Sequence, residues 1–238
     1  MALSPEILGI LIAVFVIALT AAFLFWQRRR TSRSGILVVG LNDSGKTLMF
    51  SQIVYNEFVD TFTSMKENIG DFTASKSVLK IIDIPGHERV RAKFFDEHKR
   101  NARGIAFLVD ASNLQSNIRD AAEYLYSILT DPVIASSAPS FLIVCNKQDQ
   151  TMAKGSVAVK KLLEKELNLL RKTKSSRLAS LDNSTDNAVF LGQEDKDFEF
   201  EHLNKIKVEF AETALFSAAN EEGVQIEQVE DWLERVSA

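Results

Sequence analysis

Eight consecutive residues, 40–47, have the types and spacing needed to bind a phosphate. They read Gly-Leu-Asn-Asp-Ser-Gly-Lys-Thr, a full match to the phosphate-binding loop pattern, and lie between an apolar run and the helix-like stretch 48–54. Glycine lets successive backbone N–H groups face a phosphate, Lys46 supplies a positive charge, and the Thr47 hydroxyl can ligate Mg²⁺. We therefore predict nucleotide contacts from Gly40, Leu41, Asn42, Asp43, Ser44, Gly45, Lys46, Thr47 and Leu48.

Two further motifs each end a later apolar run. Asp83-Ile-Pro-Gly86 places a carboxylate where it can hold Mg²⁺ through water, and places the Gly86 N–H where it can approach a γ-phosphate. Asn146-Lys147-Gln148-Asp149 places a carboxylate where it can accept hydrogen bonds from the ring N–H and the amine of guanine. Adenine lacks this pair of donors, so Asn146, Lys147 and Asp149 predict GTP as the ligand.

A fourth motif follows the last apolar stretch, where a backbone N–H of Ser217 or Ala218 can meet the guanine O6. All four motifs come at the carboxyl end of a predicted strand, the edge at which open α/β sheets bind ligands. Strands are expected at 36–40, 78–83, 104–110, 140–146 and within 208–216, with helical apolar stripes at 118–129, 159–170 and 226–236. This alternation predicts an α/β, P-loop GTPase fold with a mainly parallel central sheet flanked by helices.

A polar stretch interrupts this pattern at 171–202 and is expected to be a long surface loop inserted before the last strand. Within it, residues 198–200 read Phe-Glu-Phe, and we interpret them as a short edge strand or an anchor that tacks the loop down. The isolated His98 and His202 are better explained by surface or packing roles than by metal binding, because neither has a second ligand at suitable spacing.

The amino-terminal run 7–26 contains twenty residues without a charge, the length that a helix needs to cross a bilayer. A buried core helix is usually shorter and carries polar positions. A cleavable signal peptide usually has an apolar region of about 7–15 residues preceded by basic residues, and residues 1–6 contain no Lys or Arg. We therefore predict a retained, single transmembrane helix. Arg28, Arg29, Arg30 and Arg33 follow it and place the rest of the chain in the cytosol.

The resulting organisation is a short lumenal segment at 1–6, the span at 7–26, a basic linker at 27–33 and a GTPase domain at 34–238. The chain has 28 basic and 32 acidic residues, a net charge of −4 and a pI of about 5.5. This balance argues against a protein whose main task is to coat nucleic acid, and no sequence-specific nucleic-acid binding is expected. The single Cys145 excludes an internal disulfide and favours a reducing compartment.

Over 34–238 the chain resembles the Ras-like small GTPases. Together with the apolar run at 7–26, the sequences GLNDSGKT, DIPGHERVR and NKQD and the polar insertion resemble the beta subunits of the signal recognition particle receptor. That resemblance implies a GTP- or GDP-binding, Mg²⁺-dependent protein of the endoplasmic reticulum membrane. It also implies a heterodimer with the receptor's alpha subunit, held in a GTP-dependent way, and a contact with the ribosome or translocon.

Two positions depart from the small-GTPase pattern. His87 stands where many members carry a water-positioning Gln, so it is a candidate catalytic residue, and intrinsic GTP hydrolysis is expected to be slow. The metal-sensing segment 60–65 lacks the usual Pro-Thr form, which leaves Thr63 and Ser64 as alternatives, with Thr63 favoured. Two other functions are considered: a vesicle-budding GTPase of the Arf-like branch and an inactive nucleotide fold that serves as a scaffold. A permanent span argues against the first, and intact motifs argue against the second.

Overall fold

The computed structural model describes residues 14–22, 33–180, 190–193, 195–203, 205–215 and 224–238, with the backbone alone for 175–180. Contacts between Cα atoms divide the chain into two units, Met1–Arg33 and Ser34–Ala238. In the first unit residues 14–22 are helical, and the expected span at 7–26 extends beyond them at both ends. Within the described ranges, no helix combines the length and the apolar character that crossing a membrane requires.

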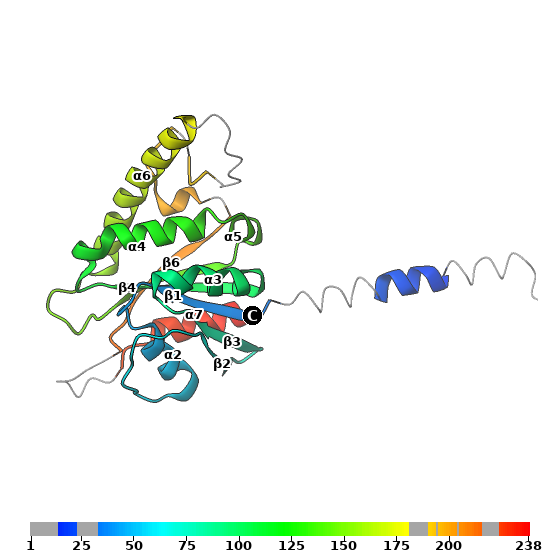
Figure 1. The fold of residues 1–238 in the computed structure, drawn as a ribbon. Helices are drawn as coiled ribbons and strands as arrows, with labels where there is room; N and C mark the ends of the chain where they lie inside the picture. The colour runs from blue at the N-terminus through cyan, green and yellow to red at the C-terminus, as the bar shows by residue number, and fades with distance from the viewer. Residues whose placement is uncertain (1–13, 23–32, 181–189, 194, 204, 216–223) are drawn as a thin grey trace, which may run out of the picture. The chain divides into compact units, whose positions relative to one another are not determined.

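The second unit is built on a six-stranded sheet with the order β2-β3-β1-β4-β5-β6 (Figure 1). Its strands are β1 (Gly35–Gly40), β2 (Asn68–Thr73), β3 (Val78–Asp83), β4 (Ala102–Asp110), β5 (Ser140–Asn146) and β6 (Val208–Glu212). Every pair of neighbours is parallel except β2 and β3, which confirms the expectation of a mainly parallel sheet. The antiparallel β2 was not predicted, because its sequence NIGDFT contains only two large apolar residues and all six positions stay partly exposed.

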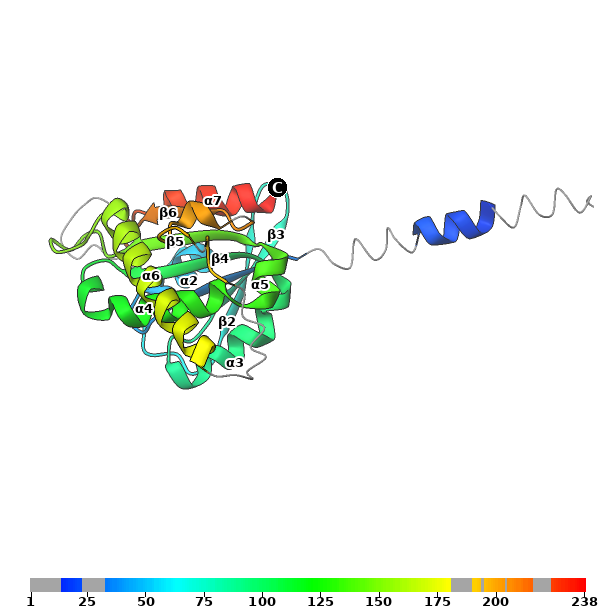
Figure 2. The same ribbon diagram turned by 90° about the horizontal axis from the view of Figure 1, so that it is seen from above.

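Helices cover both faces of this sheet (Figures 1 and 2). They are α2 (Lys46–Tyr55), α3 (Glu88–His98), α4 (Leu114–Leu129), α5 (Pro132–Ser137), α6 (Ser156–Ser180) and α7 (Glu227–Ser237), with short 3₁₀ turns at Lys99–Asn101 and Phe200–His202. Buried side chains of α3, α4, α5 and α6 form one apolar core with the sheet, and those of α2 and α7 form the other. On the second face Gly104 lets α7 pack closely, because a Cβ there would lie 2.8 Å from the ring of Trp232, which is 1% exposed.

The prediction of a surface loop is wrong for residues 171–180, because α6 continues through Ser180. The physical reason is Arg171, a polar residue that reads as loop in the sequence but is 4% exposed in the structure. Its guanidinium donates hydrogen bonds to the carbonyl oxygens of Leu191 and Gln193, at 3.3 and 2.7 Å, and so holds the returning chain against the helix. Phe198 and Phe200 are buried with ring centroids 5.4 Å apart, which confirms them as an anchor.

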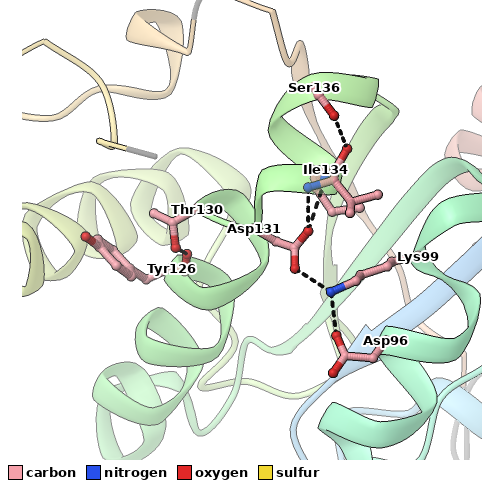
Figure 3. A network of polar contacts seen from close by, with 8 residues as sticks. Asp96, Lys99, Tyr126, Thr130, Asp131, Ile134 and Ser136 are labelled. Carbon is pink, nitrogen blue, oxygen red and sulfur yellow. Dashed lines mark hydrogen bonds and ion pairs between the residues drawn. The ribbon is translucent and has the colours of Figure 1, made fainter. Parts of the chain in front are cut away.

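A charged cluster joins the end of α3 to the start of α5 (Figure 3). Lys99 Nζ lies 2.6 Å from Asp96 Oδ1 and 2.8 Å from Asp131 Oδ2. The other oxygen of Asp131 accepts hydrogen bonds from the backbone N–H groups of Val133 and Ile134, so the same carboxylate caps α5. The charge of Lys99 is therefore neutralised within the domain.

Candidate functional site: a phosphate loop and the strand ends around it

The phosphate-binding loop joins β1 to α2 in a conformation that depends on glycine. Gly45 has a φ of 93° and begins α2, and a Cβ at this position would lie 2.2 Å from Nδ2 of Asn146. That Nδ2 donates a hydrogen bond of 2.9 Å to the carbonyl of Ser44, while Oδ1 of Asn146 accepts one of 3.1 Å from Thr213. The first residue of the predicted guanine motif thus fixes the phosphate loop from the neighbouring strand end.

Lys46 is the cation of the loop and is 6% exposed. Burial lowers the pKa of its amine to about 8, although the nearby carboxylates of Asp83 and Asp43 act in the opposite direction. Its Nζ donates to the carbonyl oxygen of Leu41 at 2.6 Å, and no carboxylate of the described residues lies within ion-pair distance. A buried ammonium that has a carbonyl partner but no paired anion suits an anionic ligand such as a phosphate.

Gly86 lies directly against this cation. A Cβ at position 86 would lie 2.7 Å from Nζ of Lys46 and 2.7 Å from Oδ1 of Asn42, so a side chain would fill the space beside the ammonium. The absence of a side chain therefore leaves room for a phosphate oxygen between the loop and the Gly86 backbone. The approach of the Gly86 N–H to a γ-phosphate stays a prediction.

Asp83 and Thr47 provide oxygen atoms next to Lys46. Oδ2 of the fully buried Asp83 accepts hydrogen bonds from Thr47 Oγ1 at 2.8 Å and from Asn68 Nδ2 at 2.9 Å. Oδ1 of Asp83 is buried and has no partner among the described residues, and burial raises the pKa of this carboxyl. An unpartnered carboxylate oxygen beside a hydroxyl fits a hard divalent cation such as Mg²⁺, which prefers oxygen ligands.

Ser64 rather than Thr63 approaches these oxygens. Ser64 Oγ lies 3.3 Å from Thr47 Oγ1, whereas Thr63 lines the same pocket but is exposed. The pocket is formed by the phosphate loop, by residues 61–64 and by Pro85 and Gly86. Segments that are far apart in the sequence therefore meet at the carboxyl ends of β1 and β3, as the motifs predict.

Asp110, which was not predicted as a site residue, contacts the motif at residues 146–149. Lys147 has a φ of 69°, and its Nζ lies 2.6 Å from Oδ2 of Asp110. Oδ1 of Asp110 accepts hydrogen bonds from Ser112 and from the N–H of Asn113. Burial acts to raise the pKa of Asp110, but these hydrogen bonds and the charge of Lys147 hold it below its ordinary value. The available signal was that Asp110 ends a buried strand, as Asp83 and Asn146 do.

The remaining predicted residues are placed less centrally. Asp149 is exposed beside Lys147, and Ser217 and Ala218 lie outside the described residues. His87 begins α3, where its Nδ1 accepts a hydrogen bond of 3.3 Å from the N–H of Arg89. This leaves Nε2 as the nitrogen that can face water.

A separate, mainly apolar cavity of about 360 Å³ lies between α5 and the segment 190–206, away from the loop.

Comparison with known proteins identifies the family. The family model described as "Signal recognition particle receptor beta subunit" matches residues 31–208. The chain belongs to this family. Curated relatives include the receptor beta subunits of Rattus norvegicus, 37% identical over 240 residues, and Homo sapiens, 39% identical over 241 residues. Each alignment covers 98% of this chain and 88% of the relative.

Solved structures of this family have the same fold. One described as "The Structure of the Mammalian SRP Receptor" is 37% identical, has a TM-score of 0.72 and covers 85% of this chain and 99% of its own. Another, "Signal recognition particle receptor SRb-GTP/SRX complex from Chaetomium thermophilum", is 20% identical with a TM-score of 0.64, and covers 87% of this chain and 98% of its own. The chain is also similar to ADP-ribosylation factor-like protein 15 of Mus musculus, at 24% identity over 55% of its length. The Arf-like resemblance is therefore weaker and shorter than the resemblance to the receptor subunits.

Proposed function

We propose that this chain is the membrane-anchored, GTP-binding subunit of a signal recognition particle receptor, which holds the alpha subunit at the endoplasmic reticulum membrane during co-translational targeting. The observation that carries the nucleotide part is the buried Lys46, which has no paired anion in its pocket and lies beside a glycine that a Cβ would crowd. Family membership supports the partner and the location. Two family structures are described as bound to GTP in a complex with SRX and to GDP with Mg.

We infer that the phosphates occupy the pocket formed by the loop, 61–64 and Gly86, and that the base lies by Asp149. Loop N–H groups and Lys46 would hold the phosphates, while Thr47 and Asp83 would hold Mg²⁺, with Thr63 or Ser64 completing its ligands. When bound, the metal neutralises phosphate charge. Lys147, fixed by Asp110, would cover the base, and the Asp149 carboxylate would select guanine over adenine.

The partner interface is proposed on the segment between α2 and β2. This segment, with the last residue of α2 and the second residue of β2, carries exposed apolar side chains: Tyr55, Phe58, Val59, Phe62, Met65 and Ile69, of which Phe62 is 88% exposed. Residues 61–64 of the same segment line the phosphate pocket, so a ligand there acts on the position of these side chains. Exposed apolar side chains on a segment that also lines the nucleotide pocket are suited to a GTP-dependent protein contact.

The test uses the full chain in membranes and measures capture of the alpha subunit with GTP or GDP. Thr47→Asn removes a hydroxyl ligand to Mg²⁺ and should weaken GTP-dependent capture by about tenfold or more. Met65→Ser, at a residue that is 60% exposed and does not line the phosphate pocket, should abolish capture without changing nucleotide affinity. Leu169→Ser, at a residue 51% exposed on α6, is the matched control and should have no effect. Equal capture by the Thr47 variant would show that the interface does not depend on the nucleotide.

Membrane anchoring is tested separately. If 7–26 spans the bilayer, the chain should resist alkaline extraction in every nucleotide state, and protease should reach 34–238 from the cytosolic side. Release after GTP hydrolysis would instead support the vesicle-budding alternative.

Whether His87 orients water is tested by His87→Ala, which should slow an already slow hydrolysis while capture of the alpha subunit is retained. Crosslinking of the same membranes tests the proposed ribosome or translocon contact.

A further inference from the structure

The amino-terminal end of the sheet carries exposed positive charge at the side where the proposed anchor joins the domain. The registers place Gly35 opposite Lys80 and Ala102, Gly104 opposite Ser140, and Phe141 opposite Val208, so β1, β3, β4, β5 and β6 begin along one edge. In both views α5, the start of β1 and the carboxyl terminus lie at this end (Figures 1 and 2). The phosphate loop lies at the opposite end of the same strands.

Four basic residues are placed along this edge, just before or at the start of strands. Lys76 precedes β3, Arg100 precedes β4, Arg103 is its second residue and Lys205 precedes β6. Lys76, Arg100 and Lys205 are exposed and Arg103 is half-buried. We call these four residues the amino-edge patch.

Glu97, three residues before Arg100, is exposed, but several other carboxylates at this end are engaged by other groups. They are Asp96 and Asp131, which both pair with Lys99 (Figure 3), Glu209, which pairs with Lys207 and Arg235, and Glu234, which binds Ser75. In the part of the chain that the structure describes, no carboxylate lies within ion-pair distance of a patch residue. The positive charge of the patch is therefore available to an external anion.

One cavity at the opposite end is mainly acidic. This cavity, of about 380 Å³ beside the phosphate loop, is lined by Asp43, Glu88, Asp120 and Glu123, with Arg91 among them. An anionic surface would attract the amino-edge patch and repel these acidic side chains, which favours an orientation with the patch toward that surface.

The length of the tether limits how far the patch can be from a bilayer. If the span ends at residue 26, residues 27–34 connect it to β1, and eight residues extend at most about 28 Å. The tether carries Arg28, Arg29 and Arg30, which an anionic surface also attracts. Screening limits such attraction to about 8 Å at physiological ionic strength. An extended tether is longer than that distance, so the tether allows the patch to approach the bilayer but does not by itself hold the patch there.

We propose that the amino-edge patch docks the domain onto anionic phospholipid headgroups of the membrane that holds its anchor, with the nucleotide end facing away from the bilayer. This inference rests on the proposed membrane anchoring. Each basic side chain near an anionic surface favours docking by about fivefold. Docking would present residues 55–69 and the nucleotide pocket toward the cytosol.

The test reconstitutes the full chain in nanodiscs of phosphatidylcholine alone or with about one-third phosphatidylserine, and measures the labelling rate of individual lysines by an amine-reactive reagent and mass spectrometry. Phosphatidylserine should slow the labelling of Lys76 and Lys205 several-fold, and high salt should restore it. Lys161, exposed near the start of α6, should label at the same rate in both discs. Arg100→Glu should remove the protection of Lys205, whereas Arg119→Glu, an exposed arginine of α4, should preserve it.

The outcomes separate the inference from the function on which it rests. A chain that elutes apart from the discs overturns the anchoring and the docking together. A chain that stays with the discs but labels equally in both compositions overturns the docking alone. Protection of Lys76 and Lys205 by added duplex RNA, with none from phosphatidylserine, would assign the patch to nucleic acid and overturn the lipid assignment.

Discussion

The two ends of the central sheet use charge in opposite ways. At the carboxyl end Lys46 and Asp83 are buried, the former with its pKa lowered and the latter with its pKa raised, and Asp43, Gly45 and Lys147 have left-handed backbone conformations. At the amino end the cations of the amino-edge patch are exposed or half-buried, and Lys99 is paired with carboxylates at ordinary distances. The difference indicates that the buried charges of the binding site lower the stability of the ligand-free domain. A bound ligand would offset this cost, whereas packing in the rest of the domain stabilises the fold.

The largest expected effect comes from Lys46→Met, which keeps the side-chain length but removes the charge. We expect nucleotide affinity to fall by about a thousandfold, because a buried charge partner of the phosphates is lost. Without nucleotide the free energy of unfolding should rise by about 1–3 kcal/mol, because a desolvated ammonium is removed. Titration with labelled GDP and urea denaturation measure the two quantities. Lys161→Met is the control and should change neither the nucleotide affinity nor the free energy of unfolding. If the Lys46 variant were less stable than the original protein without nucleotide, the proposed cost of the buried charge would be wrong.

Phe198→Ala should lower the stability of the domain and leave nucleotide affinity unchanged, the opposite of what we expect for Lys46→Met. Phe198 is 2% exposed and anchors the insertion, so truncation should lower the free energy of unfolding by about 3 kcal/mol. Nucleotide affinity measured below the unfolding transition should not change, because Phe198 is not among the residues that line the phosphate pocket. Phe190→Ala, at a residue 42% exposed, is the control and should cost much less. A parallel loss of affinity in the folded Phe198 variant would mean that stability and binding are not separable.

Asp149→Asn sharpens the comparison at the guanine end. The amide replaces one acceptor by a donor, so GTP affinity should fall by about tenfold to a hundredfold, and xanthosine triphosphate should gain. Competition binding measures the preference, with Gln150→Ala as the neighbouring control. A variant that prefers GTP by the same margin as the original would remove the proposed role of Asp149.

Asp110→Asn should have the smallest effect, about 1 kcal/mol of stability after solvent screening, because it weakens the contact with Lys147. The pKa of Asp110 is lowered in the folded state, so its contribution is constant above 3.8, the ordinary value for an aspartate, and is lost as pH falls through the folded value. Urea denaturation at neutral and acid pH should show the difference between the two proteins shrink below that point. A difference that grows in acid would contradict the assigned interaction.

The sequence predicted the parts of the fold in which local pattern and tertiary role agree. Strands β3 and β5 have the predicted bounds, because each is a mainly apolar run, interrupted by Lys80 in β3, that ends in a polar residue of the site. The edge strand β2 has no such run, since it pairs with β3 alone. The extension of α6 was missed because the hydrogen bonds that bury Arg171 come from a segment about twenty residues later.

The site residues that belong to a local sequence motif were predicted. Those whose role depends on contacts with residues distant in the sequence were missed. The phosphate loop is contained in eight residues, and the structure brings it against Gly86 and Asp83 as the motifs imply. Thr213 and Asp110 act by orienting Asn146 and Lys147, and a single sequence gives no sign of such partnerships. Thr63 and Ser64 are neighbours of similar chemistry, so their backbone direction decides which one faces Thr47.

The packing of α7 has a consequence for the order in which the molecule is assembled during its own synthesis. Trp232 and Leu233 complete the core on the face that also contains Ile36 and Val38 of β1, and Glu234 binds Ser75 in the turn between β2 and β3. On that face the first strand made is therefore covered by α2 without α7 until nearly the last residues are translated. An anchor at 7–26 would leave the ribosome long before that face could close. Insertion into the membrane would then precede nucleotide binding, and a nascent chain would reach its membrane before it could hold a partner there.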